Sequence, residues 1–272
     1  MSALPSLRDD LIAGIARDHA RRRRRLLRVG TAALSLSIVA VAVLALLPAG
    51  SSSSPARALA QATRKAADAT SGRIVWTTTE IPRVPTDDGS TAVTNTMDVR
   101  YRGEDVAIDT RSAVRQADGA ERPVGQTSAR IVDGALYYGD RGDRLATDAS
   151  GAEWLAQQTQ ALNAVAATAQ RARDVTTHAT DDVTTYEAKI DATGLKIPGG
   201  PSVPVGFSLT TGAPVTTKHA ELGTTSFGLV GRATLRVTVI DGTVKAFTIA
   251  ETDGHFTVHA ELDDEPQAIT AP

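Results

Sequence analysis

The 272-residue chain contains no cysteine, which excludes disulfide bonds, a thiol nucleophile, cysteine-ligated zinc and an acylated N-terminal cysteine. Aromatic residues are also scarce, at 4% of the sequence. The hydrophobic fraction of 42% and the charged fraction of 22% are typical of globular proteins, so disorder throughout the chain is excluded as well.

Common motifs of catalysis and metal binding are missing too. The sequence has no G-x-S-x-G elbow, no glycine-rich phosphate loop and no H-E-x-x-H motif. His255 and His259 lie four residues apart on an expected strand. That spacing separates the two imidazoles by about 13 Å, which is too far for one shared metal ion. We therefore predict a protein that is not an enzyme, with no catalytic residues, no metal ligands and no cofactor.

One long apolar segment is present near the N-terminus. Residues 29–47 contain no charged side chain and would form a helix about 28 Å long, close to the roughly 30 Å hydrocarbon thickness of a bilayer. Five consecutive arginines, Arg21 to Arg25, precede this segment, and no charge occurs in residues 48–55 after it. Positive charge marks the cytoplasmic side of a membrane helix. The sequence thus predicts a single-pass cell-membrane protein, with residues 1–28 cytoplasmic and the C-terminal domain extracytoplasmic.

A cleaved and exported form is the alternative to this anchor. The arginines resemble a twin-arginine export signal, and Ala56-Arg57-Ala58 resembles a cleavage site. The uncleaved anchor is favoured because the apolar run is longer than the roughly 7–15 residues of a signal peptide. Both interpretations place the main domain outside the cytoplasm.

Charge is unevenly distributed along the chain. Residues 1–28 hold eight arginines and three aspartates, a net charge of +5, so the remainder carries −7 of the overall −2. A basic tip on an acidic body argues against nucleic acid as a partner. Leu4, Leu7, Leu11 and Ile15 recur at helical spacing, which predicts a short amphipathic helix. This helix would lie on the lipid surface or contact a cytoplasmic protein partner, and the sequence leaves both open.

After a serine-rich linker at residues 48–57, we expect one domain at residues 58–272. Helices are expected from Pro55 to the stop at Gly72 and, free of glycine and proline, from Ala152 to Arg173. Short alternating runs punctuated by Asp-Gly pairs predict hairpins over much of the remainder. The expected strands are 73–81, 96–102, 105–113, 128–139, 184–191, 233–241, 243–251 and 256–262.

One parity of these strands is apolar and the other is polar. Leu235, Val237 and Val239 alternate with Arg236, for example, and Lys189 lies on the polar parity of its strand. This pattern is typical of an antiparallel sheet with one face in water and one covered by helices. Residues 192–215 are rich in glycine and proline and are expected to form a long flexible loop. The predicted fold class is α+β, a strongly curved antiparallel sheet, or half-barrel, packed on a few helices and preceded by the transmembrane helix.

The order of helix, strands, helix and strand meander resembles the lipoprotein-carrier (LolA/LolB-like) fold. RIVDGALYYGDRG (130–142), TTYEAKI (184–190) and LRVTVIDGTVKAFTIAE (235–251), with the terminal ITAP (269–272), are similar to actinobacterial LppX/LprG-like lipid-binding lipoproteins. The resemblance implies a membrane lipid or other apolar ligand bound between sheet and helices. This chain has no cysteine to acylate, so a transmembrane helix would replace the lipid anchor.

Strand parity selects the side chains that would line such a site. Two other functions remain open: an anti-sigma-like transmembrane signalling regulator with an outer sensor domain, and an envelope scaffold without a ligand. The predicted ligand-binding residues are Trp76, Val106, Ile108, Leu136, Tyr138, Tyr186, Ile190, Leu235, Val237 and Val239.

Overall fold

Residues 52–272 form one compact unit of the chain. The predicted cytoplasmic segment, residues 1–28, and the predicted transmembrane helix, residues 29–47, lie outside the described residues. Within the described ranges, no helix is both long and apolar enough to cross a bilayer. The computed structural model describes residues 54–84, 86–139, 142–202, 217–219 and 222–272.

Two helices and fourteen strands make up the described part of this unit. The helices are α2 (Pro55–Asp68) and α3 (Gly151–Ala169). The strands are β1 (Ser71–Glu80), β2 (Ser90–Arg102), β3 (Asp105–Gln116), β4 (Glu121–Val132), β5 (Ala135–Tyr138), β6 (Asp143–Asp148), β7 (Arg173–Ala179), β8 (Val183–Asp191), β9 (Lys196–Ser202), β10 (Thr217–His219), β11 (Gly223–Gly228), β12 (Arg232–Ile240), β13 (Thr243–Glu251) and β14 (Phe256–Asp263).

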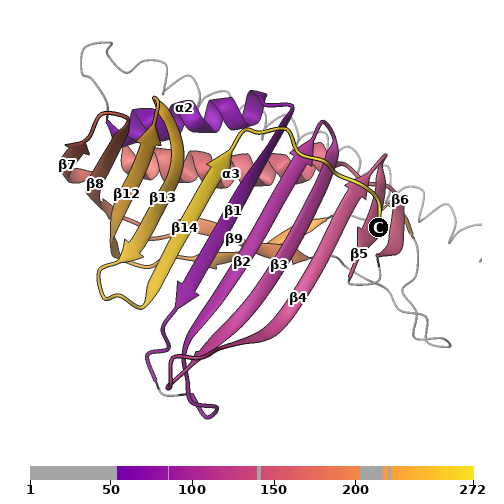
Figure 1. Ribbon diagram of the computed structural model, residues 1–272, viewed down its shortest axis with the longest axis horizontal. Helices are drawn as coiled ribbons and strands as arrows, with labels where there is room; N and C mark the ends of the chain where they lie inside the picture. The colour runs from indigo at the N-terminus through magenta and orange to yellow at the C-terminus, as the bar shows by residue number, and fades with distance from the viewer. Residues whose placement is uncertain (1–53, 85, 140–141, 203–216, 220–221) are drawn as a thin grey trace, which may run out of the picture. The chain divides into compact units, whose positions relative to one another are not determined.

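Twelve strands form one sheet in the order β10-β6-β5-β4-β3-β2-β1-β14-β13-β12-β8-β7, and β9 pairs with β11 in a second, two-stranded sheet. All neighbours in the large sheet are antiparallel except β10 and β6. Figure 1 shows α2, α3 and β9 crossing behind the strands of the large sheet. The predicted α+β class and antiparallel sheet packed on helices are confirmed for the described residues.

The predicted Asp-Gly turns occur where the sequence places them. Asp133 and Gly134 join β4 to β5 with φ values of 50° and 73°, and Asp241 and Gly242 join β12 to β13 with 49° and 73°. Two consecutive residues with positive φ are the mark of a type I′ turn, which matches the twist of the flanking strands. These two turns therefore set the register of their hairpins.

Pairing of β1 with β14 joins the N-terminal and C-terminal strand meanders into one sheet. Trp76 lies opposite Ala260 in this pairing, and Ala260 lies opposite Phe247 of β13. The small Ala260 side chain leaves room for the two aromatic rings, whose centroids are 5.8 Å apart in an edge-to-face contact. Trp76 and Phe247 are each 1% exposed, so this contact belongs to the core.

The two helices cover part of the apolar face of the sheet. The Ser54 hydroxyl accepts a hydrogen bond from the Arg57 N–H at the start of α2, where Pro55 takes the first helical position. Ser150 caps α3 in the same way. Buried residues of α3, including Trp154, recur at helical spacing and form the face that turns to the core.

Two expectations need correction, one about the segment between β8 and β12 and one about the end of α3. Part of the predicted loop at residues 192–215 is strand β9, in which Pro198 and Pro201 are paired with β11. Proline is tolerated there because each strand of a two-stranded sheet has a free edge that needs no N–H donor. The second predicted helix ends at Ala169 rather than Arg173, because Arg173 already begins the exposed edge strand β7.

The start of α3 packs against the turn between β2 and β3 without space for a side chain. A Cβ atom at Gly151 would overlap the carbonyl oxygen of Glu104 and lie 2.8 Å from the Val106 Cγ2 atom. We expect Gly151→Ala to lower the free energy of unfolding by about 1–3 kcal/mol, because helix or turn must shift. Gly228→Ala is the control, since a Cβ there meets no atom within 4 Å, and its effect should stay within about 0.5 kcal/mol. Urea unfolding of both variants measures the difference, and equal midpoints would contradict the tight contact.

Candidate ligand-binding site

The ten predicted ligand-binding residues lie on the inner face of the sheet. Nine of them are buried, with exposed fractions between 0% and 9%, and Tyr138 is half-buried. Their burial places them in the core between the sheet and its cover. Contact with a ligand stays a prediction for all ten.

Several buried polar atoms in this interior have no hydrogen-bond partner among the described residues. They include the Nε1 atom of Trp76, the hydroxyl of Thr78 on the same strand and both amide atoms of Gln158 on α3. Gln158 is 0% exposed and Thr78 is 3% exposed. Buried polar groups in folded proteins are almost always hydrogen-bonded to protein, water or ligand. The core between the sheet and the helices therefore contains hydrogen-bond donors and acceptors without partners, and one of them belongs to Trp76, a predicted ligand-binding residue.

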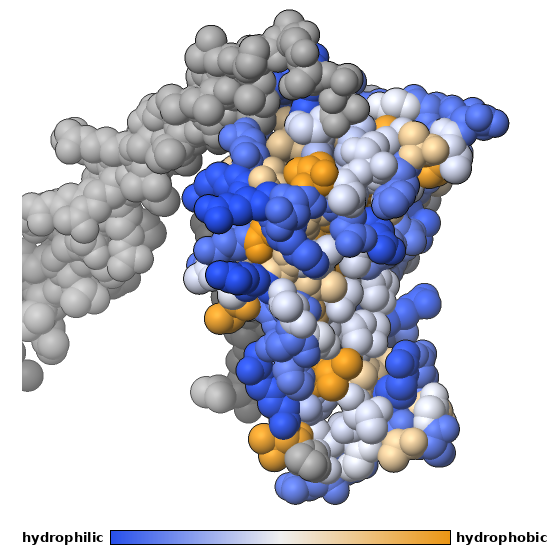
Figure 2. All heavy atoms as spheres, turned by 90° about the vertical axis from the view of Figure 1, so that its left-hand side faces the viewer, coloured by the Kyte–Doolittle hydropathy of each residue, from blue (hydrophilic) through white to orange (hydrophobic). Residues whose placement is uncertain are grey.

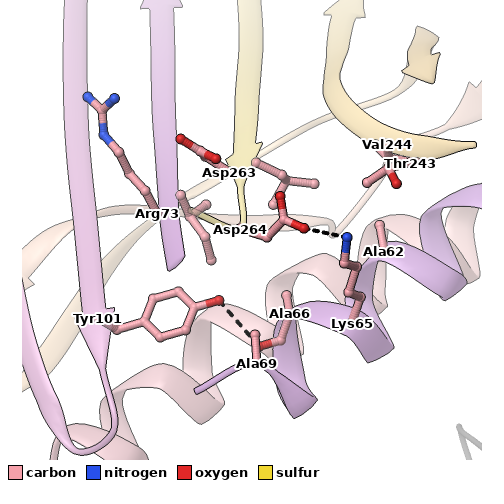
Figure 3. Close-up of a pocket in the computed structure, with 12 residues that line it drawn as sticks. Ala62, Lys65, Ala66, Ala69, Arg73, Tyr101, Thr243, Val244, Asp263 and Asp264 are labelled. Carbon is pink, nitrogen blue, oxygen red and sulfur yellow. Dashed lines mark hydrogen bonds and ion pairs between the residues drawn. The ribbon is translucent and has the colours of Figure 1, made fainter. Parts of the chain in front are cut away.

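A small cavity of about 30 Å³ lies between α2 and the ends of β1, β2, β13 and β14. In Figure 3, Lys65 of α2 points at Asp264 and forms an ion pair with it, and Tyr101 reaches the Ala66 carbonyl oxygen at 3.4 Å. Lys65 lowers the pKa of the Asp264 carboxyl group, whereas burial and the Asp264 charge raise the pKa of Tyr101. The volume matches about one water molecule. This cavity is too small for an organic ligand.

A much larger cavity, of about 720 Å³, lies at the opposite end of β13, where β12 begins. We call it the end cavity. Its volume is within the roughly 300–1,000 Å³ of typical small-molecule sites. It is bounded by the turn after α3 and by the adjoining ends of β7, β8, β12 and β13. Figure 2 faces this end of the unit, where strongly hydrophilic side chains surround scattered hydrophobic ones. The lining residues are Arg171, Arg173, Asp174, Lys189, Ile190, Asp191, Thr193, Arg232, Ala233 and Thr252.

The end cavity has a charged rim and lies against two core residues, Ile190 and Ala233, which we call its floor. Ile190 and Ala233 face the core, with exposed fractions of 4% and 0%, and lie opposite each other on β8 and β12. The six charged lining residues are all exposed. The floor side chains lie on the core face of their strands and the rim side chains of Lys189, Asp191 and Arg232 on the opposite face, so an apolar ligand would reach the floor only by opening this end of the core.

Sequence reasoning found only one of the residues that line the end cavity. Ile190 belongs to the predicted set, and the other nine predicted residues line neither described cavity. The rim comes from segments far apart in the chain, which strand register brings together: Arg173 lies opposite Lys189, and Arg232 opposite Asp191. Lys189 was identified only as a charge on the polar parity. The pairing of β7 with β8 was not predicted, so the sequence held no signal that placed Arg173 beside it.

Comparisons with known proteins give no family for this chain. No protein-family profile and no curated protein matches it. Two solved structures are similar in part: LprF from Mycobacterium bovis has 15% identity and a TM-score of 0.37, covering 80% of this chain and 95% of LprF. A β-barrel-like protein of a domain of unknown function from Brucella abortus has 12% identity and a TM-score of 0.18, covering 71% of this chain and 96% of its own. Similarity at this level establishes neither membership of a family nor a function.

Asp191 stays ionised on the cavity rim to an unusually low pH. Hydrogen bonds from the side chain and backbone of Thr193 lower the pKa of Asp191, and the charges of Arg171 and Arg232 lower it further. A carboxyl group with a lowered pKa in the folded state stabilises the fold above its unfolded pKa, and this contribution is lost as the pH falls through the folded value. Asp191 therefore supports the rim at neutral pH and not in strong acid.

We expect Thr193→Val to raise the pKa of Asp191 and to lower stability at pH 7, because one hydrogen bond to the carboxylate is lost. The part of the stability difference that comes from Asp191 should vanish once the pH falls below its folded pKa, whereas the loss of the hydrogen bond that the Gly231 N–H donates to the Thr193 hydroxyl at 3.1 Å should remain at every pH. Thr193→Ser keeps the hydroxyl and should titrate like wild type. NMR titration of the Asp191 carboxyl carbon measures the pKa in all three proteins, and an unchanged pKa in Thr193→Val would refute the assigned role of Thr193.

Proposed function

We propose that residues 58–272 form a lipoprotein-carrier-like domain that binds a lipid or other apolar ligand between its curved sheet and its helices, without catalysis. The end cavity carries this proposal, because its volume lies in the range of small-molecule sites and it lies against the apolar core at Ile190 and Ala233. A cavity of about 720 Å³ has room for part of a lipid molecule, with further chain length outside it.

Unpartnered polar atoms in the interior favour a ligand with some hydrogen-bonding capacity. Trp76 and Gln158 both carry such atoms, and both residues are at most 1% exposed. An ester or hydroxyl group entering the inner layer would satisfy them, which a pure hydrocarbon would not do. Lipids combine these groups with long apolar chains.

The proposal includes the location of the protein. Residues 29–47 would anchor it in the cell membrane, with residues 1–28 in the cytoplasm and residues 48–57 linking the anchor to the outer domain. A membrane-tethered domain would meet its lipid at the bilayer surface. The signalling and scaffold alternatives rest on the sequence alone, and no observation on the described residues favours either over ligand binding.

Filling the floor of the end cavity tests the proposed function. We expect residues 52–272, made in a membrane-containing host and purified without detergent, to retain a lipid or another apolar molecule in about equimolar amount by solvent extraction and mass spectrometry. Ala233→Leu adds volume to the floor and should reduce the bound amount several-fold. Ala250→Leu makes the same change on the neighbouring strand β13, on the outer parity, and should leave it unchanged.

Thermal unfolding shows whether both variants fold, so that loss of ligand is not mistaken for loss of structure. If both folded variants retained equal amounts of ligand, the ligand would not bind at the end cavity. A folded wild-type domain without any extractable apolar molecule would overturn the proposed function.

A further inference from the structure

The rim of the end cavity is basic in a domain that is acidic as a whole. Arg171, Arg173, Lys189 and Arg232 line it together with Asp174 and Asp191, a local balance of four cations to two anions. The chain beyond residue 28 carries a net charge of −7. The opening of the cavity is thus positively charged, whereas the domain as a whole is negatively charged.

Three of these cations form no close ion pair. Arg171, Arg173 and Arg232 make no ion pair with any other described residue within 4.0 Å. Elsewhere on the sheet, arginines such as Arg73 and Arg236 donate to carboxylates at 2.8 Å. The Asp191 carboxylate accepts hydrogen bonds from Thr193, as described above, which leaves the guanidinium groups free to bind a ligand.

Strand geometry holds the arginines around one opening. Arg173 is tied to β8 by its pairing with Lys189, and Arg232 by its pairing with Asp191 two residues further along the same strand. Asp174, with a φ of 53°, lies at a register shift of β7, between Arg173 and Thr176. Such bulges bend a strand and re-aim its side chains. The basic rim is therefore built from paired strands, and Arg171 joins it from the turn after α3.

Guanidinium groups suit one class of anion in particular. Arginine presents a planar set of donors that matches the oxygens of phosphate in bidentate contacts, and it stays charged at every physiological pH. Several arginines around one opening can bind different oxygens of the same group.

We infer that the end cavity recognises the phosphate of an anionic lipid headgroup through Arg171, Arg173 and Arg232. This inference rests on the proposed lipid-binding function and names the ligand class. Since the arginines are exposed, binding should weaken with rising salt concentration.

Native mass spectrometry of the full chain in a neutral maltoside detergent tests the inference. The probes are dioleoyl phosphatidylglycerol, dioleoyl phosphatidylcholine and glycerol 3-phosphate, which has the phosphate without acyl chains. We expect phosphatidylglycerol to bind about tenfold more tightly than phosphatidylcholine, because both carry the same phosphate but the arginines repel the choline cation of phosphatidylcholine. In Arg173→Gln/Arg232→Gln this preference should disappear, while phosphatidylcholine binding persists.

The matched control is Arg102→Gln/Arg111→Gln. It removes the same charge from two exposed residues of β2 and β3 that line neither cavity, so it should keep the preference. Lipid that associates with Arg21 to Arg25 is common to all three proteins and cancels in the comparison. Circular dichroism confirms that both double variants fold.

Each remaining outcome contradicts a different part of the account. Equal binding of both lipids by wild type, or an equal loss of preference in both double variants, would overturn the headgroup assignment and leave lipid binding intact. Glycerol 3-phosphate binding as tightly as phosphatidylglycerol, in an arginine-dependent way, would assign the rim to a soluble phosphate and overturn the lipid headgroup. Failure of either lipid to bind wild type would overturn the proposed function itself.

Discussion

The alternation of apolar and polar side chains along one very long sheet is the constraint on which the rest of this domain depends. Twelve strands share a single inner face, and the pairing of β1 with β14 makes that face continuous across the two meanders. The apolar side chains on this face must be removed from water, because exposing them would forfeit about 25 cal/mol for each Å². The edge strand β7, by contrast, is exposed along its whole length. Helices of 14 and 19 residues and the two-stranded β9–β11 sheet provide the cover.

The outer face of the same sheet shows how the polar parity is stabilised. Asp109 accepts hydrogen bonds from Arg130 at 2.9 and 3.1 Å and pairs with Arg100, so one carboxylate links three neighbouring strands. Burial raises the pKa of Asp109, but these arginines, together with a hydrogen bond from Ser128, outweigh burial and lower it. Several arginines of the outer face are thus neutralised by carboxylates of neighbouring strands, as Arg100 and Arg130 are by Asp109.

Local patterns predicted the strands and turns well, and long-range pairing was beyond them. The Asp133-Gly134 and Asp241-Gly242 turns follow from backbone conformations that glycine and aspartate tolerate, so they are readable from a few residues. Strand β7 has no buried side chain, and β9 contains two prolines, so neither carries the usual strand signal. The candidate site depends on those two segments: parity identified Ile190 on its floor, whereas the arginine rim exists only because β7 pairs with β8.

Binding of an apolar chain at the end cavity is the central claim, and paramagnetic relaxation in NMR tests it most directly. A fatty acid with a nitroxide near its terminal methyl group would be added to residues 52–272. The account predicts that the amide signals of Ile190, Ala233 and Thr252 broaden first, because these residues line the cavity. Broadening centred instead on the exposed apolar side chains Val84 and Val124, or spread evenly over the surface, would contradict it.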